Sequence, residues 1–70
     1  MKYVYTVSDE NHGVVAHFSN EQAAKDCVEH ISVVDYGMRT DEEIFEDRWG
    51  NQMVWWGMYE VYDSLEERDI

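Results

Sequence analysis

The spacing of apolar side chains changes within the first 31 residues, and this change constrains the fold more than any other feature. Residues 2–7 (KYVYTV) alternate and are rich in β-branched and aromatic types, which predicts a strand. The turn formers SDENHG lead to residues 13–18 (GVVAHF), the second strand of a hairpin. One face of each strand should be apolar: Tyr3, Tyr5 and Val7 in the first, and Val14, Ala16 and Phe18 in the second.

A helix should follow the hairpin directly. Ser19 and Gln22 have the spacing of a capping box, which marks a helix start. The apolar residues beyond this cap recur at helical spacing and predict a helix over about residues 20–31: Ala23, Ala24, Cys27, Val28 and Ile31. Residues 32–38 (SVVDYGM) fit either a short strand or an irregular connection.

Residues 40–50 (TDEEIFEDRWG) are unusually acidic and allow two interpretations. Thr40 and Glu43 form a second capping box and Gly50 sits where a helix would stop, which predicts a helix over 41–49. The alternative is a hairpin whose two-residue turn, Gly50 and Asn51, joins IFEDRW to QMVWWG. On the helix, four acids would form two rows with a rise of about 6 Å per step: Glu42 with Glu46, and Glu43 with Asp47.

Residues 52–62 (QMVWWGMYEVY) predict the longest strand, and both of its sides are apolar. Met53, Trp55, Tyr59 and Val61 lie on one side, and Val54, Trp56, Met58, Glu60 and Tyr62 on the other. Both sides therefore need cover, unless one is an interface. Gly57 is the kind of residue that marks a bulge, and Ser64 with Glu67 could begin a further helical turn.

These elements predict one α+β domain over residues 1–70. A small antiparallel sheet should carry one or two helices on one face, in the order β-β-α-(β)-α-β. The apolar stripe of the helix over 20–31 requires an apolar sheet face, which the hairpin and the last strand can provide.

The charge of the chain limits its partners. Sixteen acidic residues against five basic ones give a net charge of −11, and residues 40–70 carry −8 of it. Direct binding of nucleic acid or of an anionic membrane is disfavoured, and cationic partners are favoured. Cys27 is the only cysteine and no apolar run approaches about 18 residues, so we expect a cytoplasmic protein without a membrane span.

No constellation of residues predicts catalysis. The serines lack a nucleophile motif, and no glycine-rich loop for phosphates is present. Cys27 and His30 have a spacing that can bind zinc, but a four-ligand site would also need His12 and His17. We interpret Cys27 as a core residue and His30 as a residue near the helix C-terminus, and we expect no enzyme activity, cofactor or metal.

The segments KYVYTV, GVVAHFS and A-A-x-x-C-V resemble the hairpin-plus-helix opening of many small bacteriophage early proteins. The acidic second half is similar in kind to phage DNA-mimic inhibitors of restriction, CRISPR or repair enzymes. This resemblance implies a stoichiometric inhibitor that binds a DNA- or RNA-binding protein of a bacterial host.

The predicted contact residues combine charge with an apolar hold: Glu42, Glu43, Glu46, Asp47, Trp56, Met58 and Glu60. The alternative is a structural or adaptor protein that forms a homodimer through its apolar strand and uses its acids only for solubility.

Overall fold

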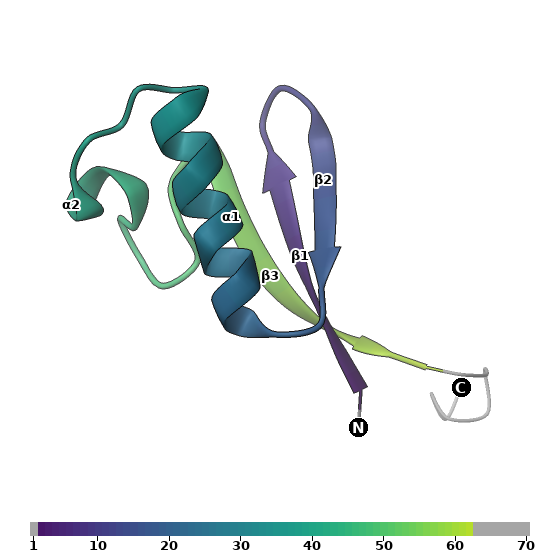
Figure 1. Ribbon diagram of the computed structural model, residues 1–70. Helices are drawn as coiled ribbons and strands as arrows, with labels where there is room; N and C mark the ends of the chain where they lie inside the picture. The colour runs from purple at the N-terminus through teal and green to yellow at the C-terminus, as the bar shows by residue number, and fades with distance from the viewer. Residues whose placement is uncertain (1, 63–70) are drawn as a thin grey trace.

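The protein is an α+β domain in which two helices lie on the same side of a three-stranded sheet (Figure 1). The computed structural model describes residues 2–62. Along the chain the elements are β1 (Lys2–Asp9), β2 (Gly13–Phe18), α1 (Glu21–Val34), α2 (Asp41–Ile44) and β3 (Val54–Val61). The predicted order is confirmed without its optional third strand, and the helical turn expected at Ser64 lies outside the described residues.

The sheet is antiparallel, and its strand order is β2-β1-β3. The pairing of β1 with β3 runs from Lys2 opposite Val61 to Asp9 opposite Val54 without a shift of register. The prediction of a bulge at Gly57 is therefore wrong. Because β1 is the central strand, it pairs with β2 on one side and with β3 on the other.

The one irregularity of register lies between β1 and β2. Val7 pairs with Ala16, whereas the next residue, Ser8, pairs with Val14. Val14 and Val15 therefore both lie opposite Ser8, as in a β-bulge. The predicted face of β2 is correct at Ala16 but fails at Val14, which is exposed.

The N-cap of helix α1 lies one residue after its predicted position. Asn20, and not Ser19, is the N-cap: its Oδ1 accepts the Ala23 N–H at 2.8 Å. The helix then continues through Val34, so the first part of the segment 32–38 is helical. Gly37, with φ of 67°, follows it and donates its N–H to the Val33 carbonyl at 3.1 Å, a common way to end a helix.

The core lies between α1 and the sheet. It is formed by residues that are at most 3% exposed: Val7, Ala24, Val28, Ile44, Val54 and Trp56. Trp56 fills the largest part of it and donates its indole N–H to the Arg48 carbonyl at 3.0 Å. Trp55, the preceding residue of the strand, points to the other side and is 37% exposed.

Candidate protein-binding surface

The acidic segment begins as predicted, with a capped helix. Thr40 Oγ1 accepts the Glu43 N–H at 3.2 Å, and Glu43 Oε2 reaches back to the Arg39 N–H at 3.4 Å. Three acids lie in the first turn, where they complement the helix dipole. However, α2 ends at Ile44 after four residues, so the helix over 41–49 is wrong beyond this point.

Asn51 explains why α2 ends. Its Nδ2 donates to the Ile44 carbonyl at 2.8 Å, and this carbonyl would accept the Arg48 N–H if the helix continued. Asn51 is only 9% exposed. All its side-chain positions are used: Nδ2 also donates to Ser32 Oγ at 3.0 Å, and Oδ1 accepts the N–H groups of Met53 at 2.8 Å and Val54 at 2.9 Å. One amide thus joins α1, α2 and the start of β3.

The chain reverses direction immediately before β3. The Asn51 N–H donates to the Val54 carbonyl at 2.9 Å, and Gly50 bridges Trp55. The predicted hairpin is therefore closer to the observed structure than the predicted long helix. Its turn, however, centres on residues 52–53 and not on Gly50 and Asn51. Gly50 has φ of 127°, and a Cβ there would lie 2.5 Å from the Val54 carbonyl oxygen, so only glycine fits.

The two predicted rows of acids do not form. Glu42 and Glu43 lie on α2, whereas Glu46 and Asp47 lie in the following loop because the helix has ended. All four side chains are exposed. Asp47 Oδ1 accepts the Trp49 N–H at 2.7 Å and so forms the loop, as an aspartate often does in a turn. Within residues 2–62, Glu42 and Glu46 form no ion pair.

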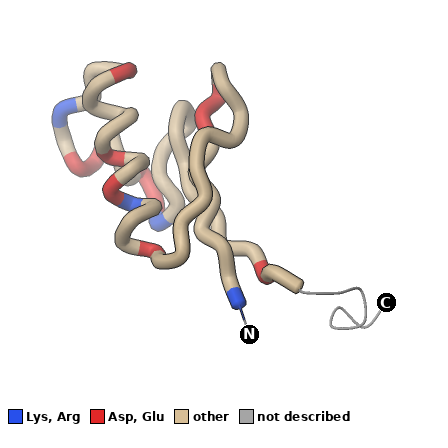
Figure 2. Tube along the Cα trace, turned by 45° about the vertical axis from the view of Figure 1, so that its right-hand side comes forward, with Lys and Arg blue, Asp and Glu red and all other residues tan. Residues whose placement is uncertain are grey.

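Within residues 2–62, the negative charge gathers on the helical side of the molecule. Residues 21–49, which we call the helical layer, contain nine acidic and three basic residues, a net charge of −6. Figure 2 shows these acids spread over α1, α2 and their loops, while the strands are almost free of charge. Among the described acids of this layer only Glu21 is ion-paired, to Lys25 at 3.1 Å and Arg48 at 3.2 Å. These two cations lower the pKa of Glu21.

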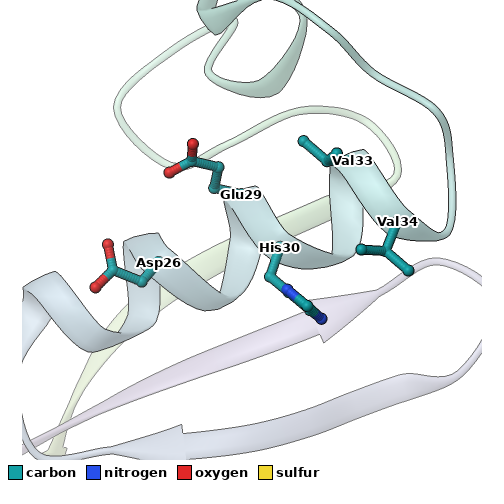
Figure 3. Close-up of a pocket in the computed structure, with 5 residues that line it drawn as sticks. All are labelled: Asp26, Glu29, His30, Val33 and Val34. Carbon is teal, nitrogen blue, oxygen red and sulfur yellow. The ribbon is translucent and has the colours of Figure 1, made fainter.

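Two shallow hollows lie on the helical layer. The first, of about 290 Å³, runs along the exposed side of α1. Figure 3 shows Asp26 and Glu29 toward one end of it, Val33 and Val34 at the other, and His30 between them. The second, of about 190 Å³, is lined by Lys25, Phe45, Asp47 and Arg48. The first hollow therefore combines two carboxylates with apolar carbon, whereas the second places two cations and one carboxylate around Phe45.

The three predicted contact residues of β3 add no exposed surface to the helical layer. Trp56 is 1% exposed, so a partner cannot reach it, and the prediction that it provides the apolar hold is corrected. The sequence could not place it, because Trp55 and Trp56 are adjacent and both sides of the strand are apolar. Met58 and Glu60 are exposed, but they lie on the half of β3 that extends away from the helices (Figure 1).

A buried carboxylate at the hairpin tip was not expected from the sequence. Asp9 is almost fully buried, and its Oδ1 accepts the Tyr36 hydroxyl at 2.6 Å and the Asn11 N–H at 2.8 Å. The Tyr36 hydrogen bond, above all, holds the pKa of Asp9 below its ordinary value. This contact fastens the hairpin to the end of α1. Only the turn-forming tendency of SDENHG hinted at a role for Asp9.

The metal-binding candidates lie in different parts of the fold. Cys27 packs against the core, and its burial raises the pKa of the thiol. His30 is exposed beside the first hollow, whereas His17 Nδ1 lies 2.9 Å from Thr6 Oγ1 on the sheet. His12 lies beside Asp9 at 3.3 Å. Among residues 2–62, no three His, Cys, Asp or Glu side chains are grouped as metal ligands would be.

Within the described part of the chain, no helix has the length and apolar character needed to cross a membrane. No protein-family model, curated protein or solved structure matches this sequence.

Proposed function

We propose that this protein binds stoichiometrically to a basic, nucleic-acid-binding protein of a bacterial host and competes with nucleic acid for it. The observation that supports this proposal is the separation of charge from the sheet: the helical layer carries −6, and its carboxylates are largely unpaired. A field of one sign over one side of a small domain speeds the encounter with an oppositely charged surface.

The apolar hold comes from the hollows of the helical layer instead of from Trp56. Val33 and Val34 are exposed on the last turn of α1, where β-branched residues are poor helix formers and contribute nothing to the core. Beside Asp26 and Glu29 they form a surface for a segment that carries both lysine or arginine and apolar side chains. Charge then brings the partner to the surface, and the valines provide short-range contact.

Because the carboxylates do not form regular rows, the proposed competition with DNA rests on the field of the layer and not on phosphate-like spacing. Glu42 and Glu46 are the positions of choice for testing it, since neither side chain takes part in a hydrogen bond or an ion pair within the described region. Glu43 and Asp47 are less suitable because they accept backbone N–H groups.

The experiment begins with affinity capture from a bacterial lysate at low salt, followed by elution with salt. The captured protein is then titrated with wild type and with the double variant Glu42→Lys/Glu46→Lys. We expect the variant to bind at least about tenfold more weakly near 0.1 M salt, and the difference to shrink as salt shortens the Debye length below about 10 Å.

A matched control changes the net charge equally outside the helical layer. Glu10→Lys/Glu60→Lys alters two exposed acids of the hairpin tip and β3, and it should weaken binding much less. Equal loss in both variants would mean that only total charge matters. Simultaneous binding of DNA and this protein to one partner molecule, with no loss of DNA affinity, would refute competition.

A further inference from the structure

Among residues 2–62, the sheet side that faces away from α1 carries no acidic side chain, although the chain as a whole is strongly acidic. We call this side the outer face. Register and alternation assign its residues, because Val7, Val54 and Trp56 point into the core. It comprises Lys2, Val4, Thr6 and Ser8 of β1, Val14, Val15 and His17 of β2, and Trp55, Gly57, Tyr59 and Val61 of β3.

Large apolar side chains of the outer face remain exposed. Tyr59 is 59% exposed, Trp55, Val15 and Val61 about 40% each, and Val14 more than half. No helix within residues 2–62 covers them, since α1 and α2 both lie on the opposite side (Figure 1). Exposed apolar side chains gathered on one face of a small domain mark an interaction site.

The outer face is also ordered before any partner arrives. The Tyr59 ring lies across Gly57, where an added Cβ would be 2.9 Å from the ring. Thr6, directly opposite Gly57, is only 8% exposed even though no helix lies above it. Its hydroxyl lies 2.9 Å from His17 Nδ1. Tyr59 and His17 are thus held by contacts within the face, so less of their side-chain freedom remains to be lost on binding.

We propose that the outer face binds a second copy of this chain to form a two-fold symmetric dimer. A two-fold interface brings the same patch of both copies together, so acids on that patch would face the acids of the other copy. In a chain of −11, a face that carries no acid among its described residues avoids this repulsion. A cationic partner is drawn instead to the helical layer, and a back-to-back dimer leaves both helical layers exposed.

The size of the outer face indicates a weak and reversible dimer. At about 3.3 Å per residue and about 4.8 Å between strands, the sheet covers on the order of 400 Å² in each copy. Two such faces bury roughly 800 Å², below the ~1,200 Å² of stable interfaces. The dimer should therefore dissociate on dilution, and salt should strengthen it because the two copies repel each other.

Sedimentation equilibrium of the full chain tests this proposal. The mass should rise from 8.4 kDa toward twice that value between about 5 and about 500 µM, and should rise further between ~0.15 and ~0.5 M salt. A monomer throughout this range at the higher salt overturns the proposal. A mass beyond two copies also overturns it, because open-ended pairing of the edge strands β2 and β3 would then be at work.

Two substitutions of similar exposure locate the contact. Tyr59→Glu places a carboxylate on the outer face and should weaken the dimer at least about tenfold, because an unpaired charge would be buried. Val34→Glu adds the same charge to the helical layer, where residue 34 is 64% exposed, and should change dimerisation less than threefold. An equal effect of both substitutions overturns the assignment to the outer face.

A third substitution keeps the test valid if Tyr59→Glu disturbs the strand. Val15→Lys lies on β2, at the other edge of the sheet, and reduces the negative charge while removing apolar surface. It should also dissociate the dimer, with circular dichroism and thermal unfolding as the check on folding. A Val15→Lys dimer as strong as wild type would contradict the proposal.

Discussion

Residues 2–38 and residues 40–56 are held together by different interactions. In the first region, strand ladders and the apolar stripe of α1 provide most of the structure. In the second, single polar side chains bind backbone groups: Thr40 caps α2, Asp47 forms the loop and Asn51 closes the turn. A conservative substitution should therefore be tolerated in the first region and not at the key positions of the second.

The largest effect should come from Asn51→Asp. The new carboxylate loses both donors, to Ser32 and to the Ile44 carbonyl, and places negative charge against that carbonyl. We expect a loss of about 4 kcal/mol in the free energy of unfolding, measured by urea denaturation. That is a large part of the stability of a chain of this size, which is roughly 0.05–0.15 kcal/mol per residue.

The matched control for that substitution is Asn20→Asp in the first region. It introduces the same charge, but the cap of α1 needs only an acceptor for the Ala23 N–H, and aspartate supplies one. The free energy of unfolding should change by no more than about 0.5 kcal/mol. If both variants lost the same stability, charge and not hydrogen bonding would govern the effect.

The next largest effect should come from Gly50→Ala. A Cβ at this position would lie 2.5 Å from the Val54 carbonyl oxygen, on a backbone with φ of 127°. We expect a loss of about 2–3 kcal/mol in thermal or urea unfolding. Gly37→Ala provides the comparison, because φ is 67° there but the space is open, and about 1 kcal/mol should be lost. Similar losses at both glycines would show that the close approach at Gly50 does not matter.

A smaller effect is expected for Ile31→Val in the apolar stripe of α1. Ile31 packs against the core but is only partly buried. Removing one methylene should therefore lower the free energy of unfolding, measured in urea, by about 1 kcal/mol. A loss above about 3 kcal/mol would indicate that the periodic region is as sensitive to detail as the turn.

The smallest effect should be the pH dependence of the Asp9–Tyr36 contact, which links the hairpin to α1. The folded pKa of Asp9 lies below its unfolded value of 3.8, so its contribution is complete above that value and is lost as the pH falls through the folded pKa. Tyr36→Phe removes the main cause. The difference in stability between wild type and variant should be constant near pH 6 and shrink below about pH 4. A difference that is the same at pH 3 and pH 6 would exclude this linkage.

The two regions also differ in how far the sequence predicts them. The alternation in β1 and the helical spacing from Ala23 to Ile31 repeat a signal over several turns or residues, so one misplaced cap at Ser19 did not change the outcome. The end of α2 depends on one carbonyl, that of Ile44, and on its hydrogen bond with a residue seven positions later. A capping box predicts where a helix begins but not where tertiary contacts end it.

The candidate surface was predicted in composition but not in geometry. The acids of residues 41–47 are exposed as expected, because charged side chains remain in water whatever the backbone does. Their rows depended on the helix and vanished with it. The choice between Trp55 and Trp56 for the core depends on which side of β3 the helix covers, and the contact between Asp9 and Tyr36 spans 27 positions. Both depend on tertiary contacts that leave no local signal in the sequence.

The central position of β1 has a consequence for the time course of folding. The hairpin and α1 involve neighbours in the chain, and such contacts close in microseconds. The ladder between β1 and β3, by contrast, joins Lys2 to Val61 and Asp9 to Val54, so its formation requires a loop that contains every other element. Closing so long a loop is entropically slow. We therefore expect this ladder to limit the folding rate, and a chain emerging from the ribosome to hold β1 half-paired until Val54–Val61 has been synthesised.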